Sequence, residues 1–89
     1  MSSQIPIVDT LEFEIRRRIL VALPDARIEL RDLTGTADHW QATVISVGFE
    51  GKTPVARQRA IFAALGELMS GPIHALTLKT LTPSQVQTA

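Results

Sequence analysis

Residues 26–47 read ARIELRDLTGTADHWQATVISV, and this stretch decides the fold. Over 26–32 apolar residues alternate with charged ones, which is typical of a half-buried strand. Residues 39–47 are rich in β-branched and aromatic side chains and predict a second strand. The segment Thr34-Gly35-Thr36 between them has turn chemistry. Because the two strands are so close in sequence, we expect an antiparallel hairpin.

A helix is predicted before this hairpin. A tail over residues 1–8 precedes Asp9, which is the expected N-cap, and Glu12 completes a capping box. Apolar residues then recur at helical spacing until Pro24 ends the helix. The predicted buried stripe consists of Leu11, Ile15, Ile19 and Ala22.

A second helix is predicted after the hairpin. Thr53 is its expected cap and Pro54 fits its first position. The helix is expected to run to about Ser70, before Gly71-Pro72 ends it. The predicted buried stripe consists of Val55, Ile61, Phe62, Leu65, Leu68 and Met69.

Residues 74–80 alternate again and predict a third strand. The helix that joins it to the second strand favours a parallel, right-handed crossover between them. The sequence therefore predicts an α/β (α+β) fold of order α-β-β-α-β. The predicted three-stranded mixed sheet carries the helices on one face. The domain is expected to occupy residues 9–83, followed by a flexible C-terminal tail over 84–89.

Composition narrows the function. Nine basic and nine acidic residues give a formal net charge of zero, without the basic excess of a nucleic-acid-binding protein. The run Arg16-Arg17-Arg18 follows Glu12 and Glu14, which predicts a solvated helix face. No cysteine is present, so a metal would need His, Asp or Glu ligands. We expect no membrane span, no signal peptide and a cytoplasmic location.

Four segments together resemble the BolA family. They are Asp38-His39-Trp40, Phe49-Glu50-Gly51-Lys52, the helical run from Ala56 to Phe62, and Ile73-His74-Ala75-Leu76 followed by Leu81-Thr82-Pro83. Their order and spacing match the family over almost the whole chain. The resemblance implies a fold similar to class II KH domains. It also implies a monothiol glutaredoxin partner, a bridging [2Fe–2S] cluster and a role in iron–sulfur trafficking or iron sensing.

The resemblance also implies site residues. The family's C-terminal ligand histidine corresponds to His74, and the histidine that closes the hairpin corresponds to His39. The hairpin loop departs from the family, because it lacks the Cys or extra His that often supplies a second ligand there. Gln58 stands where the family helix often has a histidine.

Coordination chemistry favours a shared cluster. A [2Fe–2S] cluster takes four ligands and prefers thiolates, whereas this chain offers two histidines and no thiol. The isolated chain is therefore expected to bind none, and to complete a cluster held by glutaredoxin and glutathione. A structural histidine is the alternative, with His39 paired to Asp38 or to the backbone. No credible nucleophile lies near Asp38 and His39, so we expect no enzyme.

Basic residues around the second helix suggest contacts. Arg57 and Arg59, with Lys52, are the expected partner-binding residues, because guanidinium groups suit carboxylates such as those of glutathione. A solvated or salt-bridged face is the alternative.

Two other functions stay open. The first is a nucleic-acid-binding transcriptional regulator with a KH-like or helix-turn-helix-like surface that includes Lys52, Arg57 and Arg59. Its GxxG match at 48–51 contains Glu50, which would repel phosphate, and the two glycines fit turns around a buried Phe49. The second is an interaction module, such as a weak homodimer, that uses Phe13 and Leu20 off the first helix's stripe.

Overall fold

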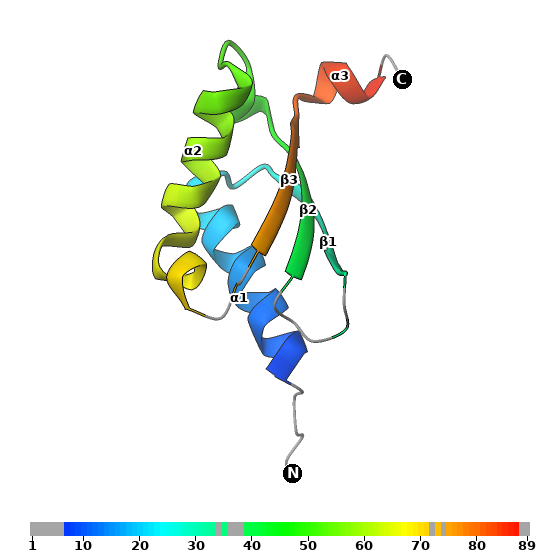
Figure 1. Ribbon diagram of the computed structural model, residues 1–89. Coiled ribbons are helices and arrows are strands. Elements are labelled where there is room, and N and C mark those ends of the chain that lie inside the picture. The colour runs from blue at the N-terminus through cyan, green and yellow to red at the C-terminus, as the bar shows by residue number, and fades with distance from the viewer. Residues whose placement is uncertain (1–6, 34, 36–38, 72, 74, 88–89) are drawn as a thin grey trace.

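The computed structural model describes residues 7–33, 35, 39–71, 73 and 75–87 of the chain, and Figure 1 shows the order of the elements. The helices are α1 (Ile7–Ala22), α2 (Pro54–Leu65) and α3 (Pro83–Gln87), and the strands are β1 (Arg27–Asp32), β2 (His39–Ile45) and β3 (Ala75–Leu81). Short 3₁₀ helices occupy Val47–Phe49 (η1) and Gly66–Ser70 (η2). None of the helices in this part of the chain is long and apolar enough to cross a membrane.

β2 is the central strand of a three-stranded sheet, between β1 and β3. It pairs antiparallel with β1, with Val44 opposite Ile28, and parallel with β3, with Ala42 opposite Leu78. The parallel pair follows from α2, which carries the chain back along the sheet before β3 begins. The predicted mixed sheet is confirmed.

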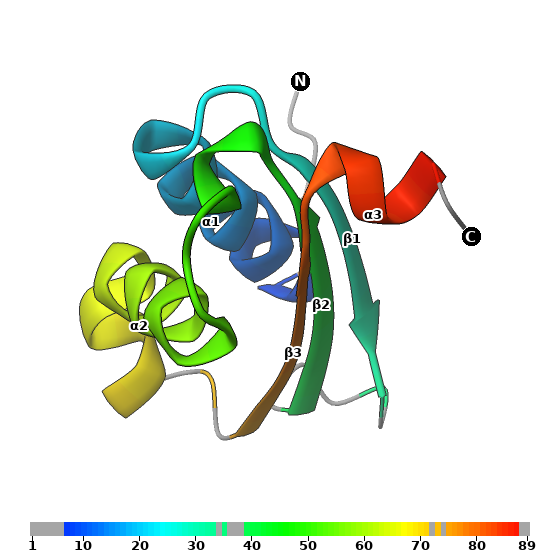
Figure 2. The same cartoon turned by 90° about the horizontal axis from the view of Figure 1, so that it is seen from above.

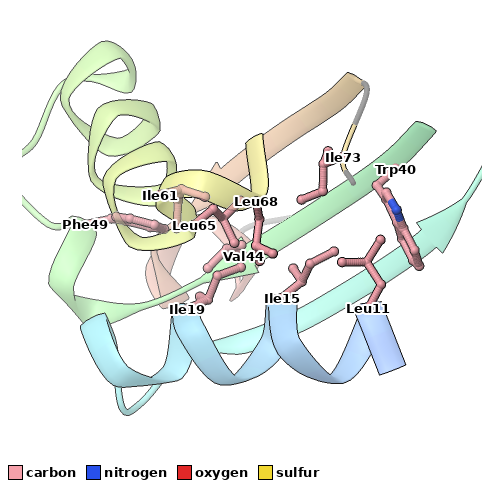
Figure 3. Packing of buried hydrophobic residues seen from close by; sticks show 10 residues of the cluster. All are labelled: Leu11, Ile15, Ile19, Trp40, Val44, Phe49, Ile61, Leu65, Leu68 and Ile73. Carbon is pink, nitrogen blue, oxygen red and sulfur yellow. The ribbon is translucent and has the colours of Figure 1, made fainter. Parts of the chain in front are cut away.

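α1 and α2 cover one face of the sheet, as Figure 2 shows, and the core lies between these layers. Leu11, Ile15 and Ile19 of α1 are buried, because their spacing of four residues keeps them on one helix face. In Figure 3, Leu11 and Trp40 lie at one end of the core and Phe49 lies at the other. The predicted stripe of α1 is confirmed apart from Ala22, which is exposed.

The start of α1 differs from the prediction. The helix begins at Ile7, directly after Pro6, rather than at Asp9. An N-cap residue contributes only about 1 kcal/mol, so Asp9 alone does not determine where the helix begins. Asp9 therefore lies inside the helix, where it cannot serve as the N-cap. The carboxylate of Glu12 accepts hydrogen bonds from Arg16 instead of completing a capping box.

The start of α2 matches the prediction and its end does not. Thr53 caps the helix by accepting a hydrogen bond from the Ala56 N–H at 3.1 Å. The helix ends at Leu65, because Gly66 has a positive φ of 54°, and η2 replaces the predicted last turn.

The predicted stripe of α2 is wrong at two positions. Val55 and Phe62 are 57% and 39% exposed, whereas Ile61 is fully buried. Six residues separate Val55 from Ile61, which turns their side chains about 120° apart on a helix. Phe62 directly follows Ile61 and points to the flank of the buried face.

Two strand and tail boundaries also shift. β2 ends at Ile45 rather than at residue 47, because the Ser46 side chain caps η1 by accepting from the Gly48 N–H. Residues 83–87 form α3, where the sequence predicted only a tail. Thr82 begins this turn, since its Oγ1 accepts from the Gln85 N–H at 3.3 Å and its own N–H donates to Gln85 Oε1 at 2.8 Å.

Candidate functional site

The predicted ligand His39 is the first residue of the central strand β2, at the end of the sheet where β2 and β3 begin. It pairs with Ala75, the first residue of β3, because the two strands are parallel and start side by side. The carbonyl of His39 accepts a hydrogen bond from the Leu33 N–H at 2.8 Å, which closes the β1–β2 hairpin. His74, the other predicted ligand, precedes Ala75 in the sequence and lies outside the described residues. We call this end of the sheet, with His39 and Ala75, the histidine edge.

Buried residues anchor the chain on both sides of this edge. Trp40 follows His39 and is 1% exposed, and Ile73 precedes His74 and is also 1% exposed. The Ile73 N–H donates to the Leu68 carbonyl at 3.0 Å, which fixes Ile73 against η2. Because side chains alternate along a strand, burying Trp40 against the helices directs His39 to the opposite face. His39 is half-buried there.

The donor set of the described residues fits a share of a metal cluster and does not fit a complete one. They contain no cysteine, and no group of three or more His, Cys, Asp or Glu residues among them could hold a metal ion. His39 contributes one half-buried imidazole at the start of β2. His74, joined to Ala75 by a peptide bond, is the second imidazole of the chain. The arrangement suits ligands added to a cluster that another molecule carries.

Arg57, a predicted partner-binding residue, forms hydrogen bonds with other residues of this protein. Its guanidinium donates to the Lys52 carbonyl at 3.0 Å, to Gln85 Oε1 at 3.1 Å and to the Thr80 carbonyl at 3.4 Å. It also lies 5.8 Å from the centre of the Phe49 ring, within the range of a cation–π contact. Arg57 thus joins α2, the end of β3 and α3.

Lys52 and Arg59 are exposed, as a contact role requires. Neither side chain makes an ion pair with another described residue, so both charges face solvent on the helix side of the molecule. Their predicted contact with a partner stays a prediction.

The loop over residues 48–51 is built around the core. Phe49 is fully buried, which confirms the structural interpretation of the two flanking glycines. A Cβ on Gly48 would lie 2.8 Å from a methyl carbon of Leu23, so a larger residue at this position would require the Leu23 side chain to shift. Gly51 has a φ of 78°, which L residues with side chains rarely adopt. Glu50 is exposed between them.

Asp25 and Ser46 form a polar link that the sequence patterns did not reveal. The buried Ser46 hydroxyl donates to the Asp25 carboxylate at 2.7 Å, and the Val47 N–H donates to its other oxygen at 2.8 Å. These hydrogen bonds, first that of Ser46 and then that of Val47, hold the pKa of Asp25 below its usual range. The link fastens η1 to the turn between α1 and β1. The only available signal was an Asp directly after Pro24, which is also ordinary turn chemistry.

The basic run on α1 is paired with acids of the same helix. Arg16 pairs with Glu12, while Arg17 and Arg18 both pair with Glu14. Donation from Arg17, and then from Arg18, lowers the pKa of Glu14 to about 2. The predicted solvated helix face holds for Arg17, which is exposed, whereas Arg16 and Arg18 are half-buried.

The face of α1 that points away from the core also carries exposed apolar side chains. Phe13 is 65% exposed and Leu20 is 40% exposed, and they line a shallow depression together with Arg16, Arg17 and Val21. Both apolar side chains therefore lie off the core, as the sequence predicted.

Comparison with known proteins places the chain in a family. The family model described as BolA-like protein matches residues 21–85. The bovine "BolA-like protein 1" is 35% identical over 86 residues, which are 89% of this chain and 64% of that protein. The Vibrio cholerae "DNA-binding transcriptional regulator BolA" is 38% identical over 53 residues, 60% of this chain and 50% of that protein. The chain thus spans less than two thirds of the length of these relatives.

Solved structures agree with the fold. The solution structure of BolA1 from Mus musculus superposes with a TM-score of 0.79 at 33% identity, covering 99% of this chain and 75% of that one. The BolA domain of SufE1 from Arabidopsis thaliana superposes with a TM-score of 0.78 at 25% identity, covering 85% of this chain and 95% of that one. The resemblance found in the sequence is confirmed.

Proposed function

The chain belongs to the BolA-like protein family, and from this membership we propose that it is a non-enzymatic adaptor for a monothiol glutaredoxin. In this proposal it supplies histidine ligands to a [2Fe–2S] cluster that the partner carries with glutathione. The complex would act in the cytoplasm, in iron–sulfur trafficking or in iron and redox regulation. The same family membership leads us to expect a fold similar to that of class II KH domains.

The single observation that carries the proposal is the histidine edge. His39 starts the central strand beside Ala75, to which His74 is bonded, and buried Trp40 and Ile73 anchor both segments. The chain has no thiolate of its own. An anchored edge with imidazole donors is suited to complete a coordination sphere and cannot build a four-ligand sphere alone.

The chemistry of imidazole explains what such an adaptor would add. When bound, the cluster supplies the iron chemistry, and a neutral imidazole in place of a thiolate makes its potential more positive. Protons compete with iron for the same ring nitrogen, so ligation by this chain would weaken as the pH falls. Anchoring by Trp40 holds His39 in place before a partner arrives, which lowers the entropy cost of binding.

Visible spectroscopy tests the proposal. We would titrate cluster-loaded monothiol glutaredoxin with this chain and record visible absorption and circular dichroism. The spectrum should change with the wild type and should not change in the same way with His74→Ala or His39→Ala. Gln58→Ala, which alters an exposed polar side chain on α2 away from this end of the sheet, is the control and should behave like the wild type. An unchanged wild-type spectrum contradicts the proposal.

A nucleic-acid-binding regulator is the second candidate, because one relative bears the name of a DNA-binding transcriptional regulator. The loop at 48–51 does not support it, since Phe49 is buried and Glu50 stands where phosphate would bind. This function predicts an affinity for DNA that falls linearly with the logarithm of salt concentration. Absence of binding to a duplex at low salt would exclude it.

A further inference from the structure

The sheet face opposite α1 and α2 is not covered by either helix, and Figure 2 shows α3 on that side only beside the end of β3. We call it the open sheet face. Trp40, Ala42 and Val44 of β2 are buried under the helices, so the alternate residues of all three strands line the open face. This face carries Arg27, Glu29 and Arg31 of β1, His39, Gln41, Thr43 and Ile45 of β2, and Ala75, Thr77, Lys79 and Leu81 of β3.

The charges of this face are unbalanced. Arg27, Arg31 and Lys79 are exposed, and none of them makes an ion pair or a side-chain hydrogen bond with another described residue. Glu29 is the one acid on the face within the described strands. On α1, by contrast, Arg16, Arg17 and Arg18 all pair with glutamates. A chain of zero net charge therefore concentrates unpaired positive charge on its open sheet face.

The strand register connects this face to the histidine edge. His39 and Ala75 form the row of paired residues at that edge, and the next row on the same face contains Arg31, Gln41 and Thr77. Successive rows on one face of a sheet are about 7 Å apart, because they are separated by two residues. A partner that reaches His39 from the open side would therefore lie over Arg31.

We propose that the open sheet face is the docking surface for the anionic face of the cluster-carrying partner. This inference rests on the proposed function and adds where the partner binds and with what charge. A cluster ligated by thiolates is anionic, and glutathione carries two carboxylates. Exposed guanidinium groups suit carboxylates through paired hydrogen bonds.

A protein fits this face better than a nucleic acid does. Proteins that bind single strands stack bases on exposed aromatic rings, and apart from the imidazole of His39 the open face has no aromatic side chain among the described strands. Glu29 lies between Arg27 and Arg31, where a continuous phosphate backbone would meet it. A protein surface can leave a gap at this position.

Charge-reversal variants test the docking surface. We would measure the affinity for monothiol glutaredoxin, both apo and cluster-loaded, by calorimetry at low and moderate salt. Arg31→Glu combined with Lys79→Glu should weaken binding about tenfold or more and should reduce the salt dependence, as loss of complementary charge does. Glu29→Lys should strengthen binding about threefold by the same argument. Arg59→Glu, an exposed reversal on α2, tests the alternative contact predicted there and should weaken binding much less than the sheet variant does.

The possible results distinguish failure of the docking surface from failure of the proposed adaptor function. If the wild type binds and only Arg59→Glu weakens the complex, the partner docks on α2 and the inference is wrong, while the proposed function stands. If the wild type does not bind glutaredoxin, the proposed function itself fails. If the reversals on the sheet abolish binding to a DNA oligonucleotide and leave glutaredoxin binding unchanged, the face serves nucleic acid instead. Thermal unfolding followed by circular dichroism must show that each variant is folded.

Discussion

Single residues set the contacts that hold the site-bearing elements together, and Arg57 is the clearest case. Its guanidinium donates hydrogen bonds to three acceptors from three segments of the chain, so these donors are already occupied within the protein. Arg59, two residues along the same helix, faces solvent. The sequence places both arginines beside the buried stripe and does not distinguish them, because the acceptors of Arg57 come from distant parts of the chain.

Replacing Arg57 separates these two roles. Arg57→Ala should lower the free energy of unfolding by about 1–3 kcal/mol, because hydrogen bonds to charged groups are worth about that much. Arg59→Ala should change it by less than about 0.5 kcal/mol, as exposed substitutions usually do. Urea unfolding of the two variants makes the comparison, and equal effects would contradict the internal role of Arg57.

Asp25 makes stability depend on pH. Its pKa in the folded state lies below the ordinary value of 3.8, since Ser46 and Val47 donate to the carboxylate. The stability it contributes is therefore fully present above that value and is lost as the pH falls through the lowered pKa. Asp25→Asn should be less stable than the wild type at neutral pH, and the difference should shrink on acidification below the ordinary value. Unfolding measured from neutral to acidic pH tests this, and a constant difference would contradict it.

At the scale of elements, α1 has two apolar faces with different tasks. Ile15 is fully buried in the core, whereas Phe13 on the outer face is 65% exposed. The ion pairs of the three arginines run along the helix between these faces. One face therefore stabilises the fold, and the other is available for contact.

Truncating each face should give unequal results. Ile15→Ala should destabilise the protein by about 2–5 kcal/mol, because it leaves a cavity in the core. Phe13→Ala should change the free energy of unfolding by less than about 0.5 kcal/mol. The same Phe13 variant tests the weak homodimer in sedimentation experiments. A large loss of stability in Phe13→Ala would show that this side chain is part of the core.

The element boundaries show what the sequence could predict. The alternation of apolar and charged residues at 26–32 predicted a strand, and the four-residue spacing of apolar residues predicted the helix α1 that packs on the sheet. Both patterns arise because one face of each element is buried. Gly66 ended α2 early, and the short helix at 83–87 was missed, because these depend on local backbone conformation. The site was predictable only in part. His39 came from family resemblance, but its place beside Ala75 required the parallel pairing.

In the molecule as a whole, the helix layer and the sheet have different roles. α1 and α2 bury one face of the sheet and stabilise it, which leaves the other face and the histidine edge accessible. The chain is neutral as a whole, yet its open sheet face is basic, and this difference gives a partner one preferred side of approach.

Ligation by imidazole predicts how the complex responds to pH. The affinity for cluster-loaded glutaredoxin should fall on acidification, because protons displace iron from the imidazole. The affinity for apo glutaredoxin should fall much less over the same range. Calorimetry with both forms of the partner measures the difference, and parallel pH profiles would argue against histidine ligation.

The most direct measurement is pulsed EPR of the reduced complex, with ¹⁵N-labelled histidine in this chain and natural-abundance glutaredoxin. Histidine ligation predicts a ¹⁵N hyperfine coupling to the cluster that disappears when both His39 and His74 are replaced by Ala. A spectrum of the bound complex without any ¹⁵N coupling would show that this chain contributes no histidine ligand to the cluster.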